Sequence, residues 1–171
     1  LGEVKVLEAA GPSALARWPR NLALPGLGGV VARFSSQDSV ATGVQHLIDG
    51  ELGEPWVSSD QYLPQDIVFA FKDDQIASID RVVLRPQGRA PETWPRRVSL
   101  SVSTTSLFDF AEVGVFELPK EARDHELRVG AEGRFLRVRV LENHGAPTTS
   151  LNEIRIFEGF ATGYTSVLAR T

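Results

Sequence analysis

Short segments in which apolar and polar residues alternate constrain the fold of this chain most strongly. In residues 98–103, Val98, Leu100 and Val102 alternate with serines. A period of two places successive side chains on opposite faces of a strand. We therefore expect this strand to pack one face on a core and to turn the other face to solvent.

A second segment has the same period, with Leu136, Val138 and Val140 on one face and Arg137 and Arg139 on the other. Further segments with strand character cover residues 67–71, 76–84, 113–118, 126–129 and 153–157. About eight short strands separated by loops that contain Gly, Pro, Asn or Asp favour an all-β sandwich or barrel over alternating strands and helices.

The run from Ile67 to Phe71 is continuously apolar, which is typical of a strand buried on both faces. A polar turn separates it from the segment 76–84, so the two segments are predicted to form a hairpin. Residues 39–47 are the one helical stretch expected in the middle of the chain. The residues expected in the core are Ile67, Phe69, Phe71, Val82, Leu84, Val98, Leu100, Val102, Leu136, Val138, Val140, Ile154 and Ile156.

Length and composition exclude several classes of protein. With 171 residues and 42% hydrophobic residues, the chain matches one globular domain with a sizeable core. Its formal net charge of −4 gives no long-range attraction to nucleic acid or anionic membranes, and no apolar run is long enough for a membrane-spanning helix. Because the chain has no cysteine, disulfides, thiolate catalysis and cysteine-bound zinc are excluded.

The start of the chain is compatible with export, and its basic residues favour a bacterial source. The sequence begins at Leu1 without a signal-peptide pattern, which fits a processed mature chain or an excised domain. Only three of the 18 basic residues, Lys5, Lys72 and Lys120, are lysines, as is typical of a GC-rich bacterial genome. Residues 1–20 and 159–171 are less regular and are predicted to be extensions on either side of the domain.

Several motifs between residues 21 and 158 occur in the order of a known family. The opening motifs are Asn21-Leu22-Ala23, Phe34-Ser35-Ser36, Leu47-Ile48-Asp49-Gly50 and Trp56-Val57-Ser58. The closing motifs are residues 133–139, Asn143-His144-Gly145 and Leu151-Asn152-Glu153-Ile154. Together they resemble the discoidin family, which includes the type C domains of coagulation factors and the family 32 carbohydrate-binding modules. The resemblance implies a jelly-roll β-sandwich whose loops at one end bind glycans, lipids or proteins.

The resemblance also implies a structural calcium site. Asp49 and Glu153 match the family's ligand positions, and Glu54 stands where the family usually has threonine. Glu51 is a further candidate, because calcium takes several carboxylate and carbonyl oxygens from a loop. The alternative is that Asp49 caps a turn and that Glu153 is a solvated edge residue.

Sugar recognition combines a flat aromatic face with planar hydrogen-bond donors. Arg85 and Arg89 lie where the family has its arginine-bearing sugar loop, and Trp94 is expected to be more exposed than Trp56, which is expected in the core. Asn143 and His144 are either turn residues or ligand contacts. The candidate ligand-binding residues are Tyr62, Arg85, Arg89, Trp94, Asn143 and His144.

No catalytic motif accompanies these residues. The sequence has no Gly-x-Ser-x-Gly elbow, no His-Glu-x-x-His motif and no glycine-rich phosphate loop, and His125 is expected to be a solvated surface residue. We therefore expect a non-catalytic binding module of an extracytoplasmic bacterial protein, with a glycan as its ligand. The alternative is a structural module that docks on a partner protein within a larger assembly.

Overall fold

The computed structural model describes residues 19–59 and 62–159. These residues form ten strands. The strands are β1 (Val30–Phe34), β2 (Trp56–Val57), β3 (Gln65–Ala70), β4 (Ala77–Arg85), β5 (Pro95–Ser103), β6 (Ala111–Glu117), β7 (His125–Gly133), β8 (Phe135–Asn143), β9 (Ser150–Leu151) and β10 (Glu153–Glu158). Short 3-10 helices cover Pro25–Leu27, Val40–Thr42, Val44–Ile48, Lys72–Asp74 and Pro91–Thr93. Two of these lie within or beside the predicted helical stretch 39–47.

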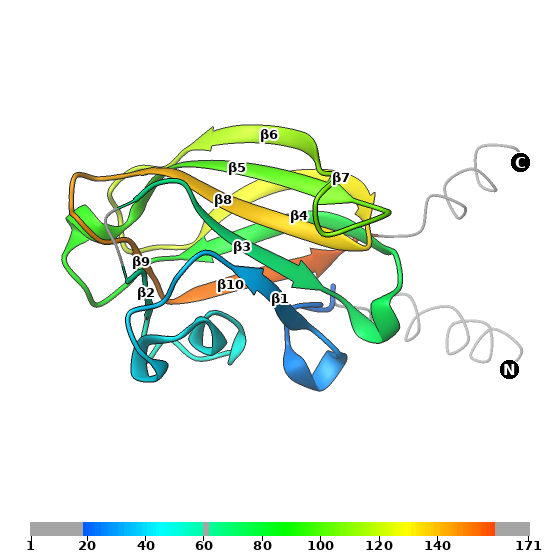
Figure 1. Ribbon diagram of the computed structural model, residues 1–171, viewed down its shortest axis with the longest axis horizontal. Helices are drawn as coiled ribbons and strands as arrows, with labels where there is room; N and C mark the ends of the chain where they lie inside the picture. Colours follow the sequence, from blue (N-terminus) through cyan, green and yellow to red (C-terminus); the bar gives the residue numbers. More distant parts are fainter. Residues whose placement is uncertain (1–18, 60–61, 160–171) are drawn as a thin grey trace, which may run out of the picture.

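Two antiparallel sheets face each other. One has five strands in the order β1-β3-β8-β5-β6 and lies in front in Figure 1, and the other has three strands in the order β10-β4-β7. A small ladder of β2 and β9 closes one end of the molecule. The predicted antiparallel β-sandwich is thereby confirmed.

The core fills the space between the two sheets. Every predicted core residue is buried except Val102, which is partly buried. Trp56 is fully buried as expected, and its Nε1 donates a hydrogen bond of 2.9 Å to the Ser36 carbonyl. The inner-face pattern of β8 is also confirmed, since Leu136, Val138 and Val140 are fully buried.

The predicted hairpin between residues 67–71 and 76–84 is wrong. Strand β3 pairs with β1 and β8, whereas β4 pairs with β10 and β7, so the turn between them crosses from one sheet to the other. Asp73 and Asp74 have φ angles of 55° and 54° in this turn. Each strand lies between two others in its own sheet, and this position accounts for the apolar residues that were read as a sign of a hairpin.

The serine face of β5 does not meet solvent as predicted. Ser99, Ser101 and Ser103 are all buried. Ser99 Oγ donates to the Glu112 carboxylate, and Arg137 donates to Ser101 Oγ. Ser103 Oγ accepts from the Thr105 and Ser106 amides of the connection between β5 and β6, which folds back over the outer face of the five-stranded sheet. Leu107 and Phe110 from this connection pack on a small apolar cluster, which consists of Val68, Ala70 and Phe135. The sheet is therefore partly covered on both faces.

The first and last described residues lie together. The Arg20 guanidinium donates to the Glu158 carboxylate at 2.9 and 2.8 Å, and Asn21 Oδ1 accepts a hydrogen bond from the Ile156 amide. Residues 1–18 and 160–171, within the predicted extensions, lie outside the described residues. Within the described ranges, the chain contains no helix with the length and apolar character needed to cross a membrane.

Truncation of Leu100 tests the core. Leu100 is fully buried on a strand that lies between β8 and β6, so we expect Leu100→Ala to lower the free energy of unfolding by roughly 2 to 5 kcal/mol in urea titrations. Val115 is 42% exposed, and Val115→Ala should change the free energy by less than about 0.5 kcal/mol. Equal effects of the two substitutions would show that β5 does not face the core.

Candidate functional site

Three connections meet at one end of the sandwich, and their described residues are 58–59 with 62–64, 86–94 and 144–149. Ser58 and Thr149 exchange two hydrogen bonds of 2.9 Å, which join the first and third connections. The His144 amide donates to the Trp94 carbonyl at 3.1 Å, and the Ala146 amide donates to the Glu92 carbonyl at 3.2 Å. The three connections therefore form one hydrogen-bonded surface, which we call the loop end.

The loop end lies opposite the first and last described residues. In Figure 1 it is on the left, around β2 and β9, whereas the end of β10 is on the right. The framework beneath it includes Gln65, a buried residue whose Nε2 donates to the Tyr62 carbonyl at 2.8 Å and whose Oε1 accepts from Ser36 Oγ. The position of Tyr62 is thus fixed by its main chain.

Two of the predicted ligand residues are exposed at the loop end. Tyr62 is 71% exposed. Arg89 is also exposed and follows Gly88, whose φ of 82° permits a turn that residues with a Cβ rarely adopt. These residues supply an aromatic ring and a guanidinium group, which are the two groups expected of a sugar site.

The expectation that Trp94 is an exposed stacking residue is wrong. Trp94 is only 6% exposed, and its Nε1 is buried without a hydrogen-bond partner. The 144–149 connection lies against it, because the His144 amide bonds to its carbonyl. Trp94 therefore supports the loop end from below.

Asn143 organises the third connection. Its Nδ2 lies 3.0 to 3.2 Å from the Ala146 and Thr148 carbonyls and from Thr149 Oγ1, and its Oδ1 accepts a hydrogen bond from the Gly145 amide. These bonds correspond to the turn-forming alternative that the sequence left open.

His144 packs toward the connection between β6 and β7. Its Nε2 is buried without a partner. Burial, followed by the nearby charge of Lys120, lowers the pKa of the imidazole. His125, expected to be solvated, is buried as well, and its Nε2 lies 3.0 Å from the Glu121 carbonyl. This surface prediction is wrong because residues 118–124 fold over the ring.

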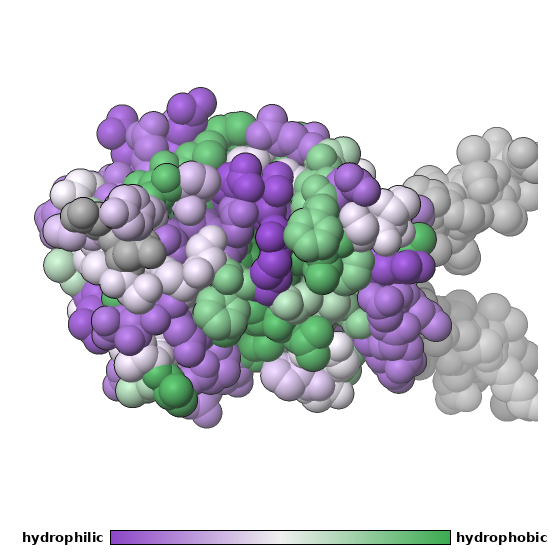
Figure 2. All heavy atoms as spheres, viewed as in Figure 1, coloured by the Kyte–Doolittle hydropathy of each residue, from purple (hydrophilic) through white to green (hydrophobic). Residues whose placement is uncertain are grey.

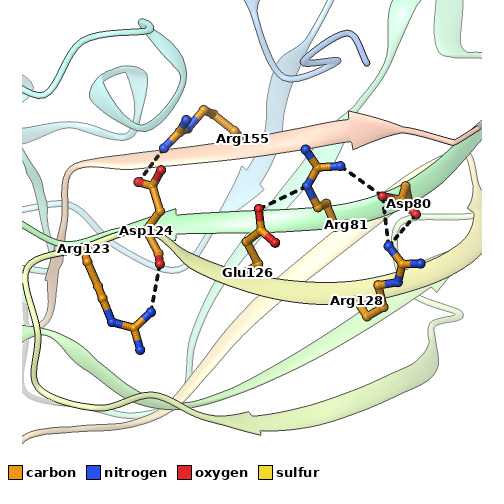
Figure 3. A network of polar contacts seen from close by, with 7 residues as sticks. All are labelled: Asp80, Arg81, Arg123, Asp124, Glu126, Arg128 and Arg155. Atoms are coloured by element: carbon orange, nitrogen blue, oxygen red, sulfur yellow. Dashed lines mark hydrogen bonds and ion pairs between the residues drawn. The ribbon is translucent and has the colours of Figure 1, made fainter. Parts of the chain in front are cut away.

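Arg85 belongs to an ionic network on the three-stranded sheet. Its guanidinium contacts Asp124 at 3.4 Å and the Gln87 side chain at 3.1 Å. Asp124 also accepts from Arg155 at 2.6 Å, and a separate group of ion pairs lies farther along β4 and β7, between Asp80, Arg81, Glu126 and Arg128 (Figure 3). The guanidinium of Arg85 is thus held by residues that flank the ends of β4 and β7.

Asp49 and Glu153 lie together, as the resemblance implies. Glu153 is only 2% exposed, and neither of its carboxylate oxygens has a hydrogen-bond partner. Burial, together with the charge of Asp49, raises the pKa of Glu153 to about 8. The alternative of a solvated edge residue is therefore wrong for Glu153. Asp49 does cap a turn, since its Oδ1 accepts from the Glu51 amide at 2.8 Å.

Glu54 is not brought into this carboxylate pair. Within the ranges that the structure describes, no three His, Cys, Asp or Glu side chains are grouped as metal ligands. Glu54 and Glu51 are both exposed. A cation at Asp49 and Glu153 would draw its other ligands from main-chain carbonyls of the loop or from water.

Sequence analysis did not identify Asn152 as an organising residue. This fully buried side chain donates to the Leu52 and Gly53 carbonyls at 3.4 and 3.1 Å and accepts from the Gln87 amide at 2.9 Å. It therefore links the loop that follows Asp49 to the connection that carries Arg89. Its position directly before Glu153 was the available signal.

Comparison with protein-family models and with curated protein sequences gave no match. Comparison with solved structures gave many. A carbohydrate-binding module, CBM32-3, from a family 31 glycoside hydrolase of Clostridium perfringens has a TM-score of 0.71 at 14% identity, covering 85% of this chain and 98% of that one.

Two further similar structures from Clostridium perfringens contain bound sugars. The module CpGH89CBM32-5, in complex with GalNAc-β-1,3-galactose, has a TM-score of 0.65 at 18% identity and covers 75% of this chain and 94% of that one. The family 32 module of NanJ, in complex with galactose, has a TM-score of 0.66 at 12% identity and covers 76% of this chain and 93% of that one. The chain therefore has the galactose-binding-like, discoidin-type β-sandwich fold of the family 32 carbohydrate-binding modules.

Proposed function

We propose that this chain is a non-catalytic carbohydrate-binding module of an exported bacterial protein, and that it binds a neutral sugar at the loop end. The observation that carries the proposal is the exposure of Tyr62 and Arg89 on connections that are hydrogen-bonded into one surface. Sites on variable loops of a rigid sandwich are a common arrangement for binding.

The chemistry of the two side chains suits a sugar of the galactose type. The apolar face of a sugar ring packs on the Tyr62 ring, and the Arg89 fork donates hydrogen bonds to hydroxyl groups. Two proteins of similar structure were solved with galactose or with GalNAc-β-1,3-galactose. The absence of catalytic motifs from the sequence favours binding without turnover.

A glycan array probed with wild-type protein, with and without calcium, tests the proposal. We expect binding to galactose- or GalNAc-terminated glycans, and we expect Tyr62→Ala and Arg89→Ala each to weaken it about tenfold, because each removes one contact of roughly 1.4 kcal/mol. Arg128→Ala is the matched control, since Arg128 is exposed on the three-stranded sheet. If no neutral glycan binds under either condition, the proposal fails and docking on a protein becomes the better interpretation.

Replacement of Trp94 tests whether its ring supports the loops from below or contacts the ligand. We expect Trp94→Ala to lower the free energy of unfolding by about 3 to 5 kcal/mol, because it leaves a cavity beneath the loops. Tyr62→Ala should leave it within about 0.5 kcal/mol of wild type, because Tyr62 is exposed. Both are measured by chemical denaturation. A Trp94→Ala protein of wild-type stability would show that the ring is exposed in solution.

We further propose that calcium binds beside Asp49 and Glu153. The buried Glu153 carboxylate has two oxygens without partners, and Asp49 lies next to it, so the residues present fit a hard cation that takes oxygen ligands. Such an ion supplies a positive charge that compensates the two carboxylates. It would also fix the loop that Asn152 links to the 86–94 connection.

Calcium should raise the melting temperature of the wild-type protein, and chelation should reverse this effect. At a concentration 100 times Kd, a ligand that binds only the native state adds about 2.7 kcal/mol, or roughly 5 to 10 °C for a domain of this size. Glu153→Gln should abolish the calcium response without lowering the stability measured in chelator at neutral pH, since a carboxyl with a pKa of about 8 is then largely protonated and the glutamine amide replaces a neutral group of similar shape. Glu54→Gln should keep the response. An unchanged transition of the wild-type protein on chelation would contradict the site.

A further inference from the structure

Two arginines lie side by side on the outer face of the five-stranded sheet. Arg33 of β1 and Arg137 of β8 both pair with Val68, one from each side. Because neighbouring strands are 4.7 to 4.9 Å apart, their Cα atoms are roughly 10 Å apart. Both side chains project from the same face, and Val68 between them is fully buried.

Neither guanidinium group has an acidic partner among the described residues. In the part of the chain that the structure describes, no carboxylate lies within ion-pair distance of either, and the Nε atoms of both are buried without a hydrogen-bond partner. The one hydrogen bond of the Arg137 side chain, to Ser101 Oγ, is long at 3.4 Å. Among the described residues, the positive charge at this position is therefore held by no ion pair, and only the more distant charges of Asp66 and Glu112 act on Arg137.

The acids nearest to Arg137 are occupied by other partners. Asp66 accepts two hydrogen bonds from Arg139, at 2.6 and 2.8 Å, and Glu112 accepts one from Ser99 Oγ at 2.8 Å. Burial, followed by the charge of Arg139, lowers the pKa of Arg137. Arg139 thus shows what a paired arginine looks like on the same strand and face, and Arg137 lacks that pairing.

Aromatic rings hold both unpaired groups in place. The Arg137 guanidinium lies 4.6 Å from the centroid of the Phe110 ring, and that of Arg33 lies 5.2 Å from the centroid of the Phe108 ring. Phe108 is 74% exposed. Figure 2 shows strongly hydrophilic side chains beside hydrophobic ones near the middle of the face that it presents. The aromatic rings therefore hold each guanidinium in place without neutralising its charge.

We propose that this arginine–phenylalanine surface binds an acidic polysaccharide through its sulfate or carboxylate groups. A guanidinium fork matches the geometry of an oxyanion and can bind it with two hydrogen bonds. The exposed part of the Phe108 ring provides a packing face for the sugar ring that carries the anion. A ligand for this surface needs both an anionic group and a flat apolar face. A sugar ring that carries an anion has both, which favours an acidic polysaccharide over an acidic peptide.

This surface goes beyond the proposed function, because it lies on a sheet face away from the loop end and takes a charged ligand. The formal net charge of −4 opposes general attraction of polyanions. A polyanion would therefore have to bind through contacts at this surface and not through the overall charge of the protein. Only substitutions on this surface should then change the affinity for a polyanion.

Isothermal titration of the full chain with dextran sulfate, at low salt, tests the proposal, with uncharged dextran as the ligand control. We expect dextran sulfate to bind and dextran not to bind. Arg33→Gln and Arg137→Gln should each weaken binding about tenfold, as the loss of a charge-assisted contact at a partly exposed site predicts. Added salt should weaken binding of the wild-type protein.

Arg128→Gln, the matched loss of one charge on the other sheet, should leave binding unchanged, and so should Tyr62→Ala at the loop end. Melting curves confirm that each variant folds. If Arg137→Gln does not fold, Arg137→Lys retains the charge without the fork and should still weaken binding. The proposal is overturned if dextran sulfate does not bind, if Arg128→Gln weakens binding equally, or if poly-glutamate binds as tightly as dextran sulfate.

Discussion

The apolar contact between the inner faces of the two sheets is the interaction on which the rest of this structure depends. Side chains such as Leu100, Val138 and Ile154 are fully buried between the sheets. Burial of such residues is the dominant favourable term in folding. Because the strands are fixed by this core, their connections emerge at defined positions at the two ends, and the chemistry of the connections is free to differ from that of other proteins with the same fold.

Hydrogen bonds between the connections then convert three separate loops into one surface. The reciprocal pair of Ser58 and Thr149 joins the connection after β2 to residues 144–149. Asn152 ties the remaining connection, residues 86–94, to the loop beside Asp49. Glu153 follows Asn152 directly, so the buried carboxylate and the connection that carries Arg89 share one support. Calcium at the proposed site would act on ligand binding indirectly, by stabilising the loop that Asn152 holds.

Local periodicity in the sequence predicted the strands but not how they pair. The alternation of Leu136, Val138 and Val140 depends only on neighbouring residues, and the structure confirms it. The pairing of β3 and β4 depends on residues far apart in sequence, so a polar turn between two apolar strands was mistaken for a hairpin. The burial of Ser99 likewise depends on a neighbouring strand, since its Oγ donates to the Glu112 carboxylate of β6.

The same limit applies to the site. Both Trp56 and Trp94 adjoin a proline, so their local sequence does not distinguish them, and only the 144–149 connection shows that Trp94 is covered. The resemblance to discoidin domains placed Asp49 near Glu153, because it carried long-range information that single-sequence patterns lack. The lack of an ion pair at Arg137 cannot be predicted from the sequence either, because it depends on the pairing of Asp66 of β3 with Arg139 of β8.

The most direct test of the central claim is a titration of ¹⁵N-labelled protein with galactose, followed by amide chemical shifts. We expect the shifts that change to be concentrated in residues 58–64, 86–94 and 144–149, with Tyr62 and Arg89 among them. Changes concentrated instead on the strands of the three-stranded sheet, or no changes at saturating sugar, would contradict a galactose-type sugar site at the loop end.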